Sequence, residues 1–378
     1  MKPKDFSQTK HFPGTMSSRF DSIVRIADAI ENIPAPVFAA LLFLIALVPS
    51  WFDWSRTLVV WLFLLGDWIL IALLPRAGKS YGPSQPPTLV LAVMRAFPAA
   101  LPTPINFIAQ LIGTALVVYG FWIEPHRVHV THQTLRTSKL KASKRPLRVL
   151  HLGDLHVERI TARERELVAH ARELNPDAIL FSGDFLSLSY VDDPIAQSHA
   201  QEILQQLSAP LGVFAVTGSP PVDQPHVIEK LLDGMPLRWL RDERISLDHD
   251  GQRVDIVGIT CTHKPHVDGA TLDDILHGDP DDLTILLYHT PDLAPVAAEQ
   301  GVDLQLSGHT HGGQVRLPFF GAIYAASLYG KLFEVGRHQI QGLTLYVTRG
   351  IGLEGEGAPR VRFLCPPEII LWEIQGER

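Results

Sequence analysis

The sequence of 378 residues predicts an all-α region that crosses a membrane, followed by an α/β sandwich. Long apolar runs within residues 32–125 predict the first part. Strands and helices that alternate from residue 147 onward, with strand-length segments and no convincing helix near the C-terminus, predict the second. A composition of 46% hydrophobic and 19% charged residues excludes a disordered chain and a small disulfide scaffold.

The net charge of −7 is divided unevenly along the chain. Residues 1–150 hold 16 Lys and Arg against 7 Asp and Glu, whereas residues 151–378 hold 17 against 33. A basic, apolar first part suits an anionic membrane surface, so we expect a lipid bilayer as a partner. The acidic second part makes nucleic acid a poor candidate, and none is expected. Cys261 and Cys365 lie far apart without CxxC spacing, which indicates neither a zinc knuckle nor a disulfide framework.

Apolar segments in residues 32–125 are candidates for three or four membrane spans. Asn32–Phe52 carries no charge for 21 residues, enough at helical rise to cross a hydrocarbon core about 30 Å thick. Thr57–Pro75 is interrupted by one acid, and Pro104–Ile123 ends in aromatic residues that favour the membrane interface. Thr88–Leu101 contains an arginine and a proline, so a fourth span, a re-entrant segment and an interfacial helix all remain open.

One acid, Asp67, falls in the middle of a predicted span. An aspartate there costs about 2.5–3.5 kcal/mol on insertion scales, so we expect Asp67 to face other helices and to pair with Arg95. Structural pairing is preferred over a proton or ion path, because a single intramembrane acid is weak evidence for a transport path. A secretory signal peptide fits badly, since the first apolar run starts late and further spans follow it.

Basic residues flank the apolar region on both sides. Five Lys or Arg precede it and seven follow it, with no acid between Glu124 and Leu150. The positive-inside rule places both flanks in the cytoplasm, which requires an even number of crossings and so favours Thr88–Leu101 as the fourth. If only three segments cross, one basic flank lies outside. We therefore predict a multi-pass protein of the cell inner membrane with a cytoplasmic second domain. The predicted division is a basic N-terminal segment (1–31), a transmembrane region (32–125), a basic linker (126–146) and an α/β domain (147–376).

The α/β domain has a regular succession of predicted elements. Strands are predicted at Leu147–Leu152, Ala178–Ser182, Gly212–Thr217, Val254–Ile259, Leu283–Tyr288, Leu304–Ser307, Leu343–Thr348 and Glu368–Ile374. Helices are predicted at Thr161–Leu174, Ile195–Leu207, His226–Leu232, Leu272–Leu276 and Leu293–Glu299, the first with Thr161 as N-cap.

Metal-ligating residue types follow four of these strands. They are Asp154, His156, Asp184, His289, His309 and His311. In an open α/β sheet the carboxyl ends of the strands share one crevice, so residues far apart in sequence can converge there. Carboxylates and imidazoles suit Mn²⁺, Fe²⁺ or Zn²⁺. Six such groups exceed what one zinc ion needs, which favours two metals about 3.5–4 Å apart with a bridging carboxylate.

The motifs around these residues resemble a known family. The runs Gly153-Asp154-Leu155-His156, Gly183-Asp184 and Gly308-His309-Thr310-His311-Gly312-Gly313-Gln314 resemble the signature of calcineurin-like metallophosphoesterases. The segments Val347–Gly352 and Pro366–Ile369 resemble the membrane-associated bacterial branch of that superfamily. The resemblance implies an αββα sandwich and two divalent metal ions. It also implies that Asp154, His156 and His311 hold one ion, that His289 and His309 hold the other, and that Asp184 bridges them.

One motif departs from the family pattern. Where Gly-Asn-His-Asp is expected after the third strand, the sequence has Gly218-Ser219-Pro220-Pro221, which lacks the Asn ligand and the His that assists the phosphate. Ser219 could coordinate weakly or through water, and Asp223 and His226 could substitute if the loop folds back. Arg349 could contact a substrate phosphate or pair with a carboxylate.

The resemblance implies a metal-dependent phosphoric ester hydrolase in which the metals activate a water molecule. The phosphorylated substrate could be lipid-linked, since the superfamily includes enzymes of lipid A synthesis that cleave UDP-2,3-diacylglucosamine. The altered motif leaves a second class open, a metal-binding pseudoenzyme that acts by binding alone.

Overall fold

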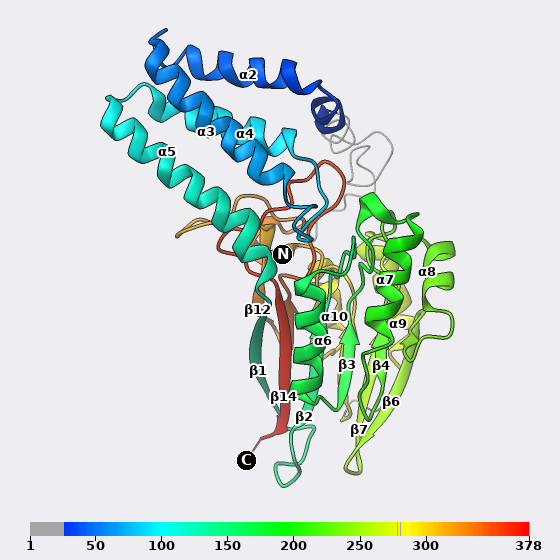
Figure 1. The fold of residues 1–378 in the computed structure, drawn as a ribbon. Helices are drawn as coiled ribbons and strands as arrows, with labels where there is room; N and C mark the ends of the chain where they lie inside the picture. The colour runs from blue at the N-terminus through cyan, green and yellow to red at the C-terminus, as the bar shows by residue number, and fades with distance from the viewer. Residues whose placement is uncertain (1–25, 278, 280, 378) are drawn as a thin grey trace.

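The computed structural model describes residues 26–277, 279 and 281–377, so most of the predicted basic N-terminal segment lies outside the described residues. A helical region precedes a domain built on two six-stranded sheets (Figure 1). The first sheet has the order β1-β14-β2-β3-β4-β5. Its strands are β1 (His129–Thr137), β14 (Glu368–Gly376), β2 (Leu147–Leu152), β3 (Ala178–Phe181), β4 (Val213–Ala215) and β5 (Arg238–Trp239).

The second sheet has the order β12-β13-β9-β8-β7-β6. Its strands are β12 (Gly336–Ile340), β13 (Leu343–Val347), β9 (Leu304–Ser307), β8 (Leu283–Leu287), β7 (Gln252–Gly258) and β6 (Glu243–His249). Strands β2, β3 and β4 are parallel to one another, as are β7, β8, β9 and β13. A small antiparallel hairpin of β10 (Arg316–Leu317) and β11 (Gly321–Ala322) stands apart from both sheets.

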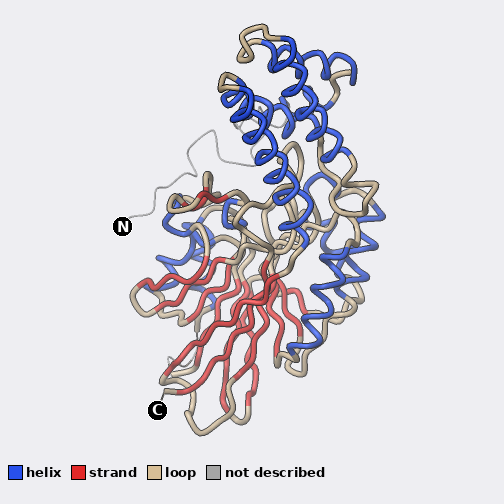
Figure 2. The backbone as a smooth tube through the Cα atoms, turned by 60° about the vertical axis from the view of Figure 1, so that its left-hand side comes forward, coloured by secondary structure: helices blue, strands red, loops and turns tan. Residues whose placement is uncertain are grey.

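Alternation along the strands builds a four-layer sandwich, because successive side chains point to opposite faces. In β2, Leu147 and Val149 pack into a core between the sheets with Ile285 and Trp372. Leu150 and Leu152 instead pack against helices on the outer face. Those helices are α6 (Ala162–Leu174), α7 (Pro194–Leu204) and α8 (Pro225–Leu232). The outer face of the second sheet carries α9 (Pro265–Ile275) and α10 (Ala294–Glu299). The predicted αββα sandwich is confirmed (Figures 1 and 2).

The eight predicted strands and five predicted helices of the domain are present, most with ends shifted by a few residues. The exception is α9, which begins at Pro265, well before the predicted Leu272–Leu276. Thr161 caps α6 in a capping box with Glu164, as the N-cap signal predicts. The segment 126–146, expected as a linker, contains β1, which pairs with β14 along nine residues. This edge strand escaped prediction because it is polar and, within it, only Leu135 is buried.

The helical region contains α2 (Ala35–Leu47), α3 (Trp54–Ala72), α4 (Gln85–Ala99) and α5 (Thr103–Val117), and α5 continues through short helical turns to His126. In the described part of the chain, Trp54–Ala72 and Thr103–His126 are the two helices long and apolar enough to cross a membrane. Within the predicted span Asn32–Phe52, the helix α2 has 13 residues and measures about 20 Å, which is shorter than expected, and the span itself stays a prediction. The ambiguous segment Thr88–Leu101 lies mostly in α4, which has 15 residues.

The predicted pair of Asp67 and Arg95 is present and buried between the helices. Thr114 Oγ1 also donates to Asp67 over 3.0 Å, and Arg95 Nε donates to Gln110 over 2.8 Å. One acid, one base and neutral hydrogen-bonding partners thus satisfy each other, which supports a structural role.

The helical region is joined to the domain by buried polar contacts. Glu124, in the helical turns that continue α5, accepts hydrogen bonds from the backbone N–H groups of Leu364 and Cys365. Glu158, two residues after His156, accepts from Arg360 Nε at 2.7 Å and from the backbone N–H of Tyr81 at 3.0 Å. Since Tyr81 lies in the α3–α4 connection, the helices are held against the same end of the domain as the strand-end residues.

Candidate metal centre

The six predicted ligand residues converge where two parallel pairs of strands end, β2 and β3 in the first sheet and β8 and β9 in the second. Asp154 and His156 follow β2, Asp184 follows β3, His289 follows β8, and His309 and His311 follow β9. Their side chains form two groups that share Asp184. The first contains Asp154, His156, Asp184 and His311, and the second contains Asp184, His289 and His309, with candidate ligand atoms within 4.8 Å of one another in each group.

Left-handed backbone conformations aim most of these side chains inward. Asp154, His156, Asp184, His309 and His311 have φ between 43° and 72°. Such conformations are uncommon for residues other than glycine and gather at functional sites. Neighbouring glycines permit the close approach, since a Cβ on Gly218 would lie 2.1 Å from Asp184 Oδ1 and one on Gly308 would lie 2.5 Å from Asp154 Oδ2. The glycines of the motifs are therefore steric requirements of the site.

The first group leaves buried polar atoms without protein partners. Nε2 of His156 lies 3.0 Å from Nε2 of His311 and 3.4 Å from Asp184 Oδ2. Asp154 Oδ1 accepts from the backbone N–H of His309, whereas its Oδ2 and Nδ1 of His311 have no hydrogen-bond partner among the described residues. Buried polar atoms are normally satisfied, and this set of facing carboxylate and imidazole atoms fits a divalent cation.

In the second group, a hydroxyl occupies the space between two imidazoles. Ser219 Oγ lies 3.1 Å from His289 Nε2 and 3.3 Å from His309 Nδ1, and the Ser219 backbone N–H donates to Asp184 Oδ1 at 2.7 Å. His289 Nε2 lies 3.3 Å from Asp184 Oδ2. His289 Nδ1 lies 2.9 Å from the Ser182 carbonyl and donates to it, so Nε2 is the ring nitrogen that faces a cation.

Burial and mutual charge set the protonation of these groups. Burial raises the pKa of Asp154 to about 6, and the charge of Asp184 adds to the rise. Burial acts in the same sense on Asp184, but the charge and hydrogen bond of His289 outweigh it and hold the pKa of Asp184 below its usual range. Burial also lowers the pKa values of His309 and His311 well below 6.5. Neutral His309 and His311 beside an ionised Asp184 suit metal binding. Burial lowers the pKa of His289 as well, but the charge and hydrogen bond of Asp184 outweigh it and raise that pKa to about 9, so a cation has to displace a proton from this imidazole.

The loop after β4 does not bring Asp223 or His226 in as substitutes for the missing motif residues. Both carboxylate oxygens of Asp223 accept backbone N–H bonds, from Asp184 at 2.7 Å, Phe185 at 3.0 Å and Gly218 at 2.6 Å. Asp223 thus fixes the backbone of the loops that carry Asp184 and Ser219. His226 is exposed in the first turn of α8, and Pro220 is exposed as well.

Arg349, offered by the sequence as a phosphate contact or a structural partner, pairs with a carboxylate. Its Nη2 lies 2.5 Å from Glu368 Oε2, and its backbone N–H donates to Glu368 Oε1. This bidentate contact joins the loop after β13 to the start of β14.

The sequence interpretation missed His263, which was left among the ordinary histidines. It lies in the loop after β7, with φ of 60°, and its ring centroid is 4.8 Å from that of His309 and 6.4 Å from that of His289. Asp268 holds this loop by accepting from the backbone N–H and the hydroxyl of Thr262. The sequence signal for His263 was its position a few residues after the end of a parallel strand. The same criterion identified the other six residues.

Comparisons with known proteins agree with this geometry. A family model described as calcineurin-like phosphoesterase matches residues 147–313. The uncharacterised metallophosphoesterase YkuE of Bacillus subtilis is 30% identical over 282 residues, which cover 68% of this chain and 89% of YkuE.

Two further relatives carry functional names. Phosphodiesterase YaeI of Escherichia coli is 27% identical, with 63% of this chain and 86% of YaeI covered. UDP-2,3-diacylglucosamine pyrophosphatase LpxG of Chlamydia trachomatis is 25% identical, with 67% of this chain and 91% of LpxG covered. With its αββα sandwich and its Asp and His cluster at the strand ends, the chain belongs to the calcineurin-like metallophosphoesterase family.

Proposed function

We propose that this protein is a membrane-anchored, metal-dependent phosphoesterase that hydrolyses a phosphodiester or pyrophosphate bond in a lipid-linked substrate. The observation that carries the proposal is the pair of ligand groups sharing Asp184. Asp154, His156 and His311 hold one divalent ion, His289 and His309 hold the other, and Asp184 contacts both. Two such cations, Mn²⁺, Fe²⁺ or Zn²⁺, supply Lewis acidity to a phosphoryl oxygen and acidify water.

The substrate approaches from the side of the second group. Asp154, His156, Asp184, His289 and His311 are buried, whereas His309 and His263 are half-buried and Lys264 is exposed. The ammonium group of Lys264 favours an anionic phosphate at this entrance, whereas burial lowers the pKa of His263 to about 4 and leaves it a neutral hydrogen-bond donor. His263 is placed to donate a hydrogen bond to a phosphoryl oxygen, a contact that Pro220 cannot make. Ser219 Oγ takes the place of the missing amide ligand.

The membrane part of the proposal rests on the helical region. Only 28% of the most apolar 18-residue stretch of each long helix is buried within the molecule, whereas a core helix of a soluble domain would be mostly covered. A bilayer would cover the rest. The basic residues that follow the helices favour a cytoplasmic domain. Anchoring raises the local concentration of the enzyme near a substrate confined to the bilayer. LpxG, named for a lipid-linked pyrophosphate, supports that substrate class.

A metal-binding pseudoenzyme remains the second candidate. The specific observation in its favour is the exposed Pro220, which stands where the family has an imidazole. Loss of that group would lower turnover without disturbing either ligand group.

Hydrolysis by the purified full-length protein separates the two candidates. The substrates are an aryl phosphodiester and UDP-2,3-diacylglucosamine, each with Mn²⁺. Asp184→Asn is the test variant, and Asp273→Asn, an exposed acid, is the matched control. We expect turnover by wild type and the control and loss of turnover by Asp184→Asn. Equal, very slow rates for all three proteins with two ions bound to wild type would establish the pseudoenzyme. Reporter fusions after Leu150 test the side of the membrane, and an extracytoplasmic signal would contradict the assignment.

A further inference from the structure

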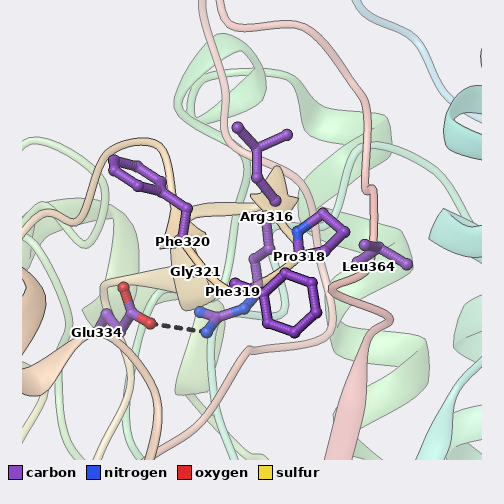
Figure 3. A pocket seen from close by; sticks show the side chains of 8 residues that line it. Arg316, Pro318, Phe319, Phe320, Gly321, Glu334 and Leu364 are labelled. Atoms are coloured by element: carbon purple, nitrogen blue, oxygen red, sulfur yellow. Dashed lines mark hydrogen bonds and ion pairs between the residues drawn. The ribbon is translucent and has the colours of Figure 1, made fainter.

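The β10–β11 hairpin presents an apolar tip to solvent. Phe319 is fully exposed, Phe320 is 57% exposed and Leu317 is 45% exposed. Ile323 and Tyr324, which follow the hairpin, are exposed as well. With Pro318 and Leu364 the tip lines an open pocket of about 480 Å³ (Figure 3). Several large apolar side chains gathered on one exposed element indicate an interaction surface.

The base of the hairpin is held firmly. Arg316 Nη2 lies 2.7 Å from Glu334 Oε1, and the backbone N–H of Ala322 donates to Glu334 Oε2. Gly321 has φ of 78°, and a Cβ there would lie 2.5 Å from Glu334 Oε1. The tip is therefore presented by a defined turn.

The hairpin is continuous with the helical region. Leu364 lines the pocket with Phe319, and its backbone N–H donates to Glu124, in the helical turns that continue α5. Phe363 packs edge-on against Tyr119 of the same helical segment, with ring centroids 5.7 Å apart. Ile108, Leu111 and Ile112 form part of the exposed apolar surface of α5. The apolar surface of the helices thus leads to the hairpin, at the end of the domain from which the helices rise (Figure 1).

One basic residue, Lys331 in the short helical turn Gly330–Phe333, lies against the tip of the hairpin. Nζ of Lys331 lies 3.5 Å from the centroid of the Phe320 ring and donates to the Phe320 carbonyl. Aromatic and aliphatic side chains beside a lysine are typical of segments that lie in the headgroup region of an anionic bilayer.

We propose that the tip Leu317–Phe320 inserts into the bilayer surface beside α5. This inference rests on the membrane anchoring proposed above and adds a second contact with the lipid. Its consequence for the reaction follows from Arg316, whose Nη1 donates to the carbonyl of Gly312, next to His311. The inserted hairpin then holds the metal centre at the level of the headgroups, where a lipid-linked phosphate lies.

Site-specific fluorescence in the full-length protein tests the insertion. Phe319→Cys is labelled with an environment-sensitive fluorophore and reconstituted into phosphatidylethanolamine and phosphatidylglycerol vesicles with and without a lipid quencher. Both native cysteines are buried, so the label goes to the new thiol. Leu62→Cys, on the exposed face of α3, reports the anchor. Ser143→Cys, in the exposed β1–β2 connection at the far end of the domain, is the aqueous reference.

We expect lipid quenching at positions 62 and 319 and none at 143. Quenching at 62 but not at 319 would overturn the hairpin proposal and leave the anchor intact. Absence of quenching at both positions would overturn the anchor and the hairpin proposal together. Quenching at 319 only by a second, spin-labelled copy of the chain would assign the tip to self-association and overturn the proposal.

A kinetic comparison tests the consequence. In Phe319→Ser/Phe320→Ser we expect hydrolysis of a vesicle-embedded lipid pyrophosphate to fall at least about fivefold, with hydrolysis of a soluble aryl phosphodiester unchanged. Leu332→Ser, a comparably exposed apolar residue, is the control. Equal loss on both substrates, or no loss on either, would contradict a role in holding the site at the bilayer.

Discussion

The hydroxyl of Ser219 lies 3.1 Å from Nε2 of His289, between the imidazoles of the second ligand group. A neutral hydroxyl is a weaker ligand than an amide carbonyl, so the second ion should be the more weakly held of the two. The second group also offers three ligand residues against four in the first, which adds to the asymmetry.

Replacing Ser219 should therefore change the affinity for one ion and not for the other. We expect Ser219→Ala to weaken binding of the second Mn²⁺ about tenfold and Ser219→Asn to strengthen it, with the first ion unaffected. Isothermal titration calorimetry of the metal-stripped protein measures both steps, and Ser143→Ala is the exposed control. A uniform change in both affinities would contradict the assignment.

His263 should affect turnover more than metal content. If His263 donates to the phosphoryl group, His263→Ala lowers kcat about 100-fold with both ions still bound. His263→Gln, which retains a donor, should recover part of the loss, and the exposed His266→Ala should behave as wild type. Unchanged kcat in His263→Ala would leave the imidazole with a packing role alone.

Asp223 should act through the loops that it holds. Asp223→Asn replaces one acceptor oxygen by an amide nitrogen facing backbone N–H groups, which should cost about 1–3 kcal/mol of unfolding free energy. Since these loops carry Asp184 and Ser219, metal affinity should fall as well. The thermal midpoint and the Mn²⁺ affinity are the readouts, with Asp273→Asn as control. Stability equal to wild type would show that the three N–H bonds contribute little.

Asp292 should make the stability of the domain depend on pH. Burial raises its pKa to about 6, so the folded state retains a proton that the unfolded state loses from about pH 4 upward. Stability should therefore fall between pH 4 and pH 6, by an amount on the order of 3 kcal/mol.

The matching variant is Asp292→Asn. Oδ1 of Asp292 accepts from Ser327 Oγ at 2.7 Å and from the Leu328 backbone N–H at 3.1 Å, and asparagine keeps that acceptor. We expect Asp292→Asn to raise the thermal midpoint at pH 8 and to have little effect at pH 4. An equal shift at both pH values would show that the charge is not the cause.

The sequence predicted the sandwich and the convergence of six ligand residues because both depend on short patterns: buried strands of defined length and polar residues directly after them. It missed β1, because most side chains of this edge strand are polar and its apolar residues show no regular spacing. It missed the place of His263, because a loop of several residues separates that histidine from its strand. It also overestimated the length of the first helix, because a hydropathy pattern does not show that α2 ends at Leu47.

The number of divalent ions held at the strand ends tests the central claim most directly. Mn²⁺ bound per chain, counted by equilibrium dialysis and elemental analysis, should be two in the wild type and two in Asp273→Asn. In Asp184→Asn, which removes the shared carboxylate charge, it should fall below one under the same conditions. A wild type that holds a single ion, or an Asp184→Asn variant that still holds two, would contradict the account.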